Sequence, residues 1–338
     1  MATSTSHSHS HGSSDDAHPA PQTEHDKLGP LGTQGGALAG DALRAAMIAE
    51  FLAAAEAAGD AATSVDAGPA TAVHEYRKAL RRARAALTLV ADALPKSERR
   101  AVERALQEAR RTVSAVRDHA VAPETLAKLT LGPEERVEAD TVLANAAAAM
   151  PPVAEIQTLL SEGAARAAAQ VEALEAALPR ALELDTVIEG VRAMYAEARE
   201  ARGGSKKSMA QFHTWRRRTK ELVYQLELLS RWGGKRVAAL YDEVHTAADA
   251  LSPAVDLIML REFVGTYAQG VGNGHVAKLA DAIDEALRAA VKEARKATRR
   301  AFARKPGKLA GKLHRAVKKD LARDEAPAEA DAAEQKAD

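Results

Sequence analysis

The chain has 338 residues, and its 47 Lys and Arg residues balance its 47 Asp and Glu residues, so the formal net charge is zero. Hydrophobic residues make up 46% of the sequence but aromatic residues only 3%, and much of the apolar content is alanine. This composition suits closely packed helices and argues against a β-sandwich core. Because there is no cysteine, disulfides, cysteine-based zinc sites, thiol nucleophiles and iron–sulfur clusters are excluded.

The first 36 residues are rich in Ser, His, Gly, Pro and Asp, with almost no large apolar side chain. Such a segment cannot bury enough surface to offset its ordering entropy, so it is predicted to be disordered. Ser and His alternate between Ser6 and His11, a pattern for which we expect no specific metal site. No stretch reaches the roughly 18 apolar residues of a membrane span, and no signal peptide is visible. We therefore expect a cytoplasmic protein without a membrane partner.

Helical periodicity runs through most of the remaining sequence, with breaks at Gly and Pro. The pattern predicts helices over residues 38–58, 69–93, 97–117, 123–130, 134–149, 153–178, 182–202, 207–231, 234–250, 254–269, 275–304 and 307–322. Residues 324–338 are mainly Ala, Glu and Asp and are predicted to form a second disordered tail. No strand alternation and no phosphate-binding glycine motif after a strand is found.

Two predicted helices resemble each other. Aligned on His74 and His213, both carry an aromatic residue at +2 and basic residues at +3, +4 and +7. Residues Val116-Arg117-Asp118 have a counterpart in Ala254-Val255-Asp256 at nearly the same offset of about 140 residues. These two marks indicate an internal duplication.

At about 100° per residue, the histidine and the cations of each motif share one helix face. Tyr76 and Trp215 belong to the opposite, apolar faces, which are expected to point into the core. A charged face is usually just solvated, and that alternative stays open for either helix alone. Solvated faces, however, normally mix both signs, whereas residues 206–220 contain six cations and no acid. Two equivalent, acid-free cationic faces predict an anionic ligand.

The duplicated H-x-x-R-[KR]-x-x-[RK] helix, the later Asp marks and the basic Phe302-Ala-Arg304-Lys305-Pro306 segment resemble the CHAD family of conserved histidine α-helical domains. The resemblance covers roughly residues 38–320. It implies an all-α fold of two antiparallel helical bundles, residues 38–180 and 181–322, related by pseudo-twofold duplication around a basic central cavity. It further implies binding of inorganic polyphosphate and, in some members, association with polyphosphate granules.

Carried over motif by motif, the resemblance implies a ligand-facing set of His74, Arg77, Lys78, Arg81, His213, Arg216, Arg217 and Lys220. Further, weaker candidates are Arg84, Tyr195, Arg199, Lys305, Lys308 and Lys312. Arginine forks and mobile lysines suit repeated phosphate groups. The first motif has Tyr76 and Ala79 where other members are richer in arginine, which predicts a weaker N-terminal side. Asp118 and Asp256 are interpreted as helix caps or as partners of a pocket arginine.

Other functions are weighed against this hypothesis. The triphosphate-tunnel domain of many CHAD proteins has no counterpart here, and no carboxylate or histidine cluster typical of a metal-dependent phosphohydrolase occurs. We therefore expect no catalytic residue, metal ligand or cofactor, and the sequence indicates no particular oligomeric state. A nucleic-acid-binding helical protein remains the main alternative, although it would normally interleave aromatic residues among the cations.

Overall fold

The computed structural model describes residues 39–206, 208–269 and 273–334. Every long regular element in these ranges is a helix, which confirms the all-α prediction. The α-helices are α1 (Ala39–Thr63), α2 (Pro69–Leu89), α3 (Lys96–Arg111), α4 (Ser114–Ala127), α5 (Pro133–Ala148), α6 (Val153–Ala177), α7 (Leu184–Gly204), α8 (Met209–Leu229), α9 (Gly234–Ala250), α10 (Ser252–Tyr267), α11 (Asn273–Ala297) and α12 (Pro306–Glu334). The segment 1–36 and its histidines lie outside the described residues.

Most predicted boundaries agree with the structure to within a few residues, and three do not. α4 begins at Ser114 and continues through Pro123, although that proline was predicted to separate two helices. A proline within a helix leaves one backbone bond unmade, a cost that the packing of α4 offsets here. α11 ends at Ala297 instead of 304, and α12 extends to Glu334, so part of the predicted acidic tail is helical.

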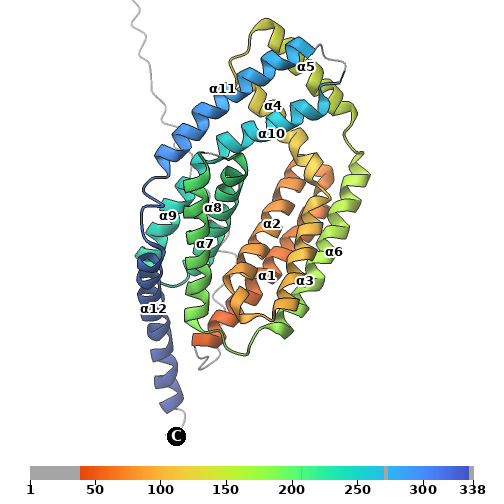
Figure 1. Cartoon of the computed structure of the whole chain (residues 1–338). Helices are drawn as coiled ribbons and strands as arrows, with labels where there is room; N and C mark the ends of the chain where they lie inside the picture. Colours follow the sequence, from red (N-terminus) through yellow and green to blue (C-terminus); the bar gives the residue numbers. More distant parts are fainter. Residues whose placement is uncertain (1–38, 207, 270–272, 335–338) are drawn as a thin grey trace, which may run out of the picture.

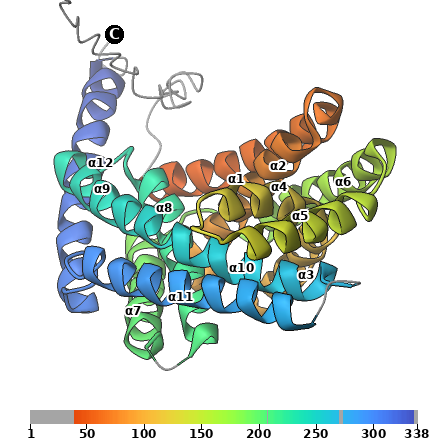
Figure 2. The same ribbon diagram turned by 90° about the horizontal axis from the view of Figure 1, so that it is seen from above.

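In residues 39–177, α1 packs against α2 and α6, and α3 against α6, whereas α4 and α5 pack mainly against helices of the second half. In residues 184–334, α7 packs against α8 and α12, and α8 against α9. α2 contacts α8, and Figure 1 places the two helices on either side of the middle of the molecule, with α4, α5, α10 and α11 together at its upper end. The view from above brings α4, α5, α10 and α11 to the front (Figure 2).

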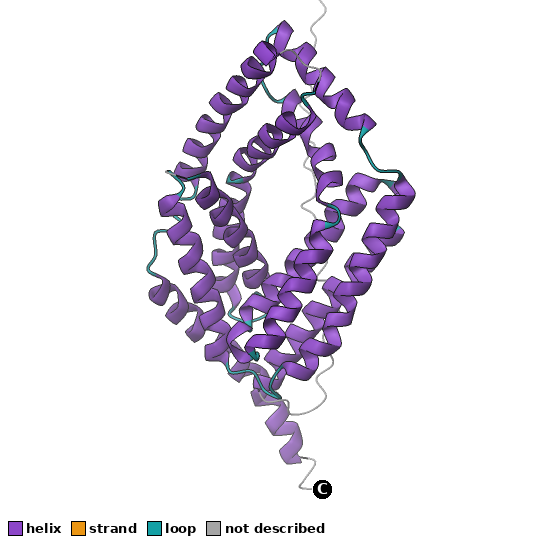
Figure 3. Cartoon of the chain, turned by 45° about the vertical axis from the view of Figure 1, so that its right-hand side comes forward, coloured by secondary structure: helices purple, strands orange, loops and turns teal. Residues whose placement is uncertain are grey.

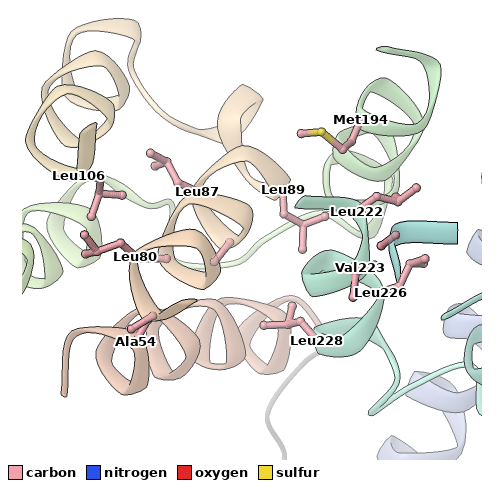
Figure 4. Packing of buried hydrophobic residues seen from close by; sticks show 14 of the residues in the cluster. Ala54, Leu80, Leu87, Leu89, Leu106, Met194, Leu222, Val223, Leu226 and Leu228 are labelled. Carbon is pink, nitrogen blue, oxygen red and sulfur yellow. The ribbon is translucent and has the colours of Figure 1, made fainter. Parts of the chain in front are cut away.

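The two halves contact each other in two separate regions, at α2 with α8 and at α4 and α5 with α10 and α11. Both contact regions are entirely helical (Figure 3). The main hydrophobic core includes Tyr76 and Trp215, both fully buried as their helix faces predict. Figure 4 shows Leu80 and Leu87 of α2 on one side of this core and Leu222 of α8 on the other. A second core joins α4 and α5 to α10 and α11 around Phe263 and Leu260.

Close helix approaches require glycine at two places in this architecture. A Cβ at Gly163 on α6 would lie 1.8 Å from the hydroxyl of Tyr76, and one at Gly190 on α7 would lie 2.3 Å from the carbonyl oxygen of Leu89. Both distances are far below any van der Waals contact. The two glycines therefore let α6 and α7 pack directly against α2, the helix that carries the first basic motif.

Candidate functional site

A cavity of about 260 Å³ lies between α2, α3, α4, α8 and α10. Of its 16 lining residues, eight are Arg or Lys, one is His, and a single one, Glu221, carries a carboxylate. We call this cavity the basic pocket. Its charged and histidine lining consists of Arg77, Arg81, Arg84, Arg110, Arg117, His213, Arg216, Arg217, Lys220 and Glu221. These like charges repel one another, and a bound anion would offset part of that repulsion.

Seven of the 14 residues predicted to face a ligand line this pocket. They are Arg77, Arg81, Arg84, His213, Arg216, Arg217 and Lys220. On both α2 and α8 the contributing residues recur at helical spacing, so that one face of each helix lines the pocket while the opposite face enters the core. The structure thus brings the two repeated motifs together at one cavity.

Polar contacts between α2 and α8 hold these two faces in place. Arg82 donates to Glu50 of α1 at 2.9 Å and to Glu227 of α8 at 3.0 Å. The side-chain amide of Gln225 donates to Thr88 at 3.1 Å. Because Glu50 is 5% exposed and Gln225 only 1% exposed, these bonds are shielded from water and fix the crossing of the two helices.

In the described part of the chain, two pocket arginines each have one buried guanidinium nitrogen without a partner, whereas Arg77 donates from Nη1 to Ser114 at 3.1 Å. Among the described residues, the Nε atoms of Arg81 and Arg216 are buried without a hydrogen bond. Burial and the neighbouring Arg81 and Arg117 lower the pKa of Arg216 to about 10. Burial and the nearby Arg117, Arg110 and Arg81 likewise lower the pKa of Arg77 to about 10. Both groups are still charged at neutral pH, and an anion beside them would stabilise this charged form.

Arg117 shows how the pocket is built from both halves. Its guanidinium lies 3.7 Å from Asp118 on its own helix and 3.9 Å from Asp256 on α10, and Nη1 also contacts the sulfur of Met259. Asp118 and Asp256 lie inside α4 and α10 rather than at helix ends. Their interpretation as caps is therefore wrong, whereas their interpretation as partners of a pocket arginine is confirmed.

The two motif histidines differ in position. His213 lines the pocket, and burial lowers its pKa, with Glu262 of α10 opposing and the positive charge of Arg216 adding to the shift. His74 does not line the pocket: its side chain is 64% exposed and lies 3.9 Å from Glu75. Lys78 also lies outside the lining and pairs with the same Glu75 at 3.2 Å.

The remaining predicted residues lie away from the basic pocket. Tyr195 is fully buried, with its hydroxyl 2.9 Å from the carbonyl oxygen of Ala301. Arg199 donates from Nε to the carbonyl oxygen of Phe302 at 3.2 Å. These bonds attach α7 to the segment between α11 and α12. Lys305 is exposed just before α12, and two further predicted lysines are exposed on that helix: Lys308 and Lys312.

The order and spacing of these helices correspond to a known domain. The family model described as the CHAD domain matches residues 46–265 of the chain, which include both basic helices. The chain belongs to the CHAD domain family.

A solved structure supports the CHAD fold. The chain is similar to the crystal structure of the CHAD domain from the plant Ricinus communis, with a TM-score of 0.54 and 18% sequence identity. The similarity covers 82% of this chain and 97% of the plant chain. No curated protein matches the sequence significantly.

This CHAD domain carries pocket residues that the motifs do not contain. Arg110 on α3 and Arg117 on α4 line the pocket, and burial lowers the pKa of each. Arg117 belongs to the repeated segment Val116-Arg117-Asp118. Val255, which corresponds to Arg117 in the second repeat, lines the same pocket. With these two residues, the first half contributes five arginines, against three cations from α8. The N-terminal half therefore contributes more positive charge to the pocket than the C-terminal half, although the first motif predicted a weaker N-terminal side.

In residues 39–206, 208–269 and 273–334, no group of three or more acidic, His or Cys side chains is placed to hold a metal ion. Within the same part of the chain, none of the helices combines the length and the apolar character needed to cross a membrane.

Proposed function

We propose that this protein binds inorganic polyphosphate in the basic pocket and leaves it chemically unchanged. The observation that carries the proposal is a cavity of about 260 Å³ lined by eight Arg and Lys residues and one carboxylate. Membership of the CHAD family adds support, because this family is associated with polyphosphate binding in general.

Polyphosphate fits the chemistry of the pocket. It is a flexible chain with about one negative charge per phosphate, and it presents nothing but oxygen acceptors. Arginine pairs with two phosphate oxygens at once, and lysine adds a mobile charge. The partnerless Nε atoms of Arg81 and Arg216 would gain acceptors, and a bound anion would offset the burial and the like charges that lower the pKa of Arg77 and Arg216.

The pocket is further interpreted as the central cavity of a duplicated structure. Arg77 of α2 corresponds to Arg216 of α8, and Arg81 corresponds to Lys220, each pair at an offset of 139 residues. All four side chains line the pocket. The packing of α1 on α2 is repeated by that of α7 on α8. Two related helical bundles that present equivalent cations to one cavity would account for these correspondences.

The nucleic-acid alternative has less support. Proteins that bind single strands without sequence preference stack bases on aromatic side chains among their cations. Among the described residues that line the basic pocket there is no aromatic ring other than the imidazole of His213. Tyr76, Trp215 and Tyr195 are fully buried in the core. The pocket is therefore suited to a chain of phosphates rather than to bases.

The test is a binding titration with polyphosphate of uniform length across a range of salt concentrations. We expect affinity to fall steeply as salt rises, because several cations release counterions on binding. The variant Arg217→Glu changes an exposed pocket cation, and Lys308→Glu makes the same charge change at an exposed position outside the pocket. Arg217→Glu should weaken binding about tenfold or more and Lys308→Glu much less. Equal losses in both variants would contradict a pocket site.

The proposal that polyphosphate is bound without being hydrolysed is tested by measuring phosphate release. Incubation with polyphosphate, with and without added divalent metal, should release no free phosphate. Steady phosphate release that the Arg217→Glu variant abolishes would show catalysis and refute this part of the proposal. In cells, we expect a fluorescent fusion to collect on polyphosphate granules and the same fusion carrying Arg217→Glu to stay diffuse in the cytoplasm.

A further inference from the structure

Glu221 of α8 is an exception in the basic pocket. It is the one carboxylate in the pocket lining and is only 3% exposed. One carboxylate oxygen lies 3.0 Å from Nε of Arg84 on α2, and the other accepts a hydrogen bond from Nη1 of Arg218 at 2.7 Å. Arg218 also pairs with Glu197 of α7 at 2.6 Å. A continuous chain of alternating charges therefore links α2, α8 and α7.

Glu221 interacts with cations on three helices, namely Arg84 on α2, Arg110 on α3, and Arg217 and Arg218 on α8. Its charge raises the pKa of Arg110 on α3 and of Arg217 on α8, in both cases against burial and like charges that lower it. For Arg218, Glu221 and Glu197 together overcome the effect of burial and raise the pKa.

Glu221 is the one carboxylate within the described pocket lining that offsets the repulsion among the pocket cations. Outside the lining, Asp118 and Asp256 flank Arg117, and Asp249 pairs with Lys220 at 3.2 Å.

Glu221 also lies where the charge of the surroundings changes. A second cavity of about 380 Å³ shares Arg84 and Gln107 with the basic pocket. Its lining adds the carboxylates of Asp92, Glu103 and Glu197 and the two cations Arg99 and Arg218, so its charges are mixed where those of the basic pocket are mainly positive. A polyanion that passed Arg84 toward this cavity would meet Glu221 first and then a lining that no longer carries a positive excess.

We propose that Glu221 is a specificity-determining residue of the polyphosphate site: its carboxylate stabilises the empty pocket, lowers the affinity for the anion and ends the anion path at Arg84. This inference rests on the proposed function. A bound phosphate chain shares Arg84 with Glu221 and is repelled by it, because the buried carboxylate is held by Arg218 and cannot leave. The Glu221 carboxylate thus raises the stability of the free protein and lowers its affinity for the ligand.

The variant Glu221→Gln tests this opposition because it removes the charge and keeps the size of the side chain. We expect it to bind polyphosphate about threefold to tenfold more tightly at low salt, with the gain shrinking as salt rises, while its melting temperature without ligand falls. A residue that only holds the structure together would lower both quantities when replaced. Glu197→Gln is the matched control, since it removes an acid from the same Arg218 but outside the basic pocket, and its affinity should change little.

A second variant covers the case in which Glu221→Gln does not fold. Gln107 is exposed and lines both cavities, so Gln107→Glu adds a carboxylate at the same end of the pocket with little risk to the fold. It should weaken polyphosphate binding about threefold or more. Unchanged or weaker binding by folded Glu221→Gln, or unchanged binding by Gln107→Glu, would overturn the role of Glu221 while wild-type binding stands. Failure of the wild-type protein to bind polyphosphate would instead refute the proposed function.

Discussion

Arg82 of α2 and Glu227 of α8 form a forked ion pair, in which Nη1 of the arginine lies 3.0 Å from both carboxylate oxygens. The same guanidinium donates from Nε to the buried Glu50 of α1 at 2.9 Å. The two glutamates raise the pKa of Arg82 despite its burial. One side chain therefore joins three helices and connects the two halves of the chain next to the basic pocket.

The first prediction concerns this junction. Arg82→Met should lower the free energy of unfolding by about 3 kcal/mol, because Glu50 would remain buried without its cation. Chemical denaturation measures the change. Arg166→Met is the control: Arg166 pairs with Glu108 at the same 3.0 Å, but both side chains are nearly half exposed, so less than about 1 kcal/mol should be lost. Equal losses in both variants would contradict the importance of burial.

A second prediction concerns the packing of α6 against α2. Gly163→Ala should destabilise the protein by about 1–3 kcal/mol, because the new methyl group would overlap the hydroxyl of Tyr76. Tyr76→Phe removes that hydroxyl along with its 3.1 Å bond to the carbonyl oxygen of Ala109. In the Tyr76→Phe background, Gly163→Ala should cost clearly less, and thermal unfolding of the four proteins gives the coupling. Additive effects would show that the two residues do not meet.

The third prediction is a pH dependence of binding. Burial and Arg216 lower the pKa of His213 in the free protein, against the opposing charge of Glu262. A bound phosphate would raise this pKa, so binding takes up a proton, and affinity should rise as pH falls from about 8 to about 6. The increase stops once His213 is already protonated in the free protein.

His213→Gln checks this dependence and should flatten the affinity profile. Long polyphosphate is the suitable ligand, since only its terminal groups titrate in this range. The stability of the free protein should move in the opposite direction: a lowered histidine pKa means that protonation favours the unfolded chain, so the fold loses stability as pH falls through about 6.5. An unchanged profile in His213→Gln would assign the pH effect to another group.

The fourth prediction separates the two polyanions. Single-stranded RNA, added at an equal concentration of phosphate groups, should displace little bound polyphosphate, because the pocket lining offers no stacking platform other than the ring of His213. Fluorescence anisotropy with labelled polyphosphate measures the competition. Complete displacement at equal phosphate concentration would favour the nucleic-acid alternative.

The spacing of charged and apolar residues was sufficient to predict much of the site. On α2 and α8, one helix face is apolar and the other cationic, so the burial of Trp215 followed from helical geometry. The same geometry placed Arg216 on the cationic face, whereas the shared cavity that it lines was implied by the family resemblance. Arg110 could not be identified in this way. It lies on a helix where Glu103 and Glu108 are mixed with arginines, and only the packing of α3 against α2 and α6 decides which of these charges reach the pocket.

Local sequence was a weaker guide where several helices compete for the same residue. Tyr195 shares a helical spacing with Arg199, which made both candidates for the ligand, yet the tyrosine is buried and bonded to the backbone near Ala301. Likewise, Pro123 is normally a helix breaker, but α4 packs against α10 and continues through this proline. In both cases tertiary contacts outweigh a local preference.

The double attachment of the two halves, through α2 with α8 and through α4 and α5 with α10 and α11, has a mechanical consequence. Two separate contact regions oppose a hinge motion between the halves, so the spacing of the pocket cations is set before a ligand binds. Under the proposed function, the polymer would adapt its own shape to a preformed site and bear most of the entropy loss. Its capture would then be limited by encounter rather than by rearrangement of the protein.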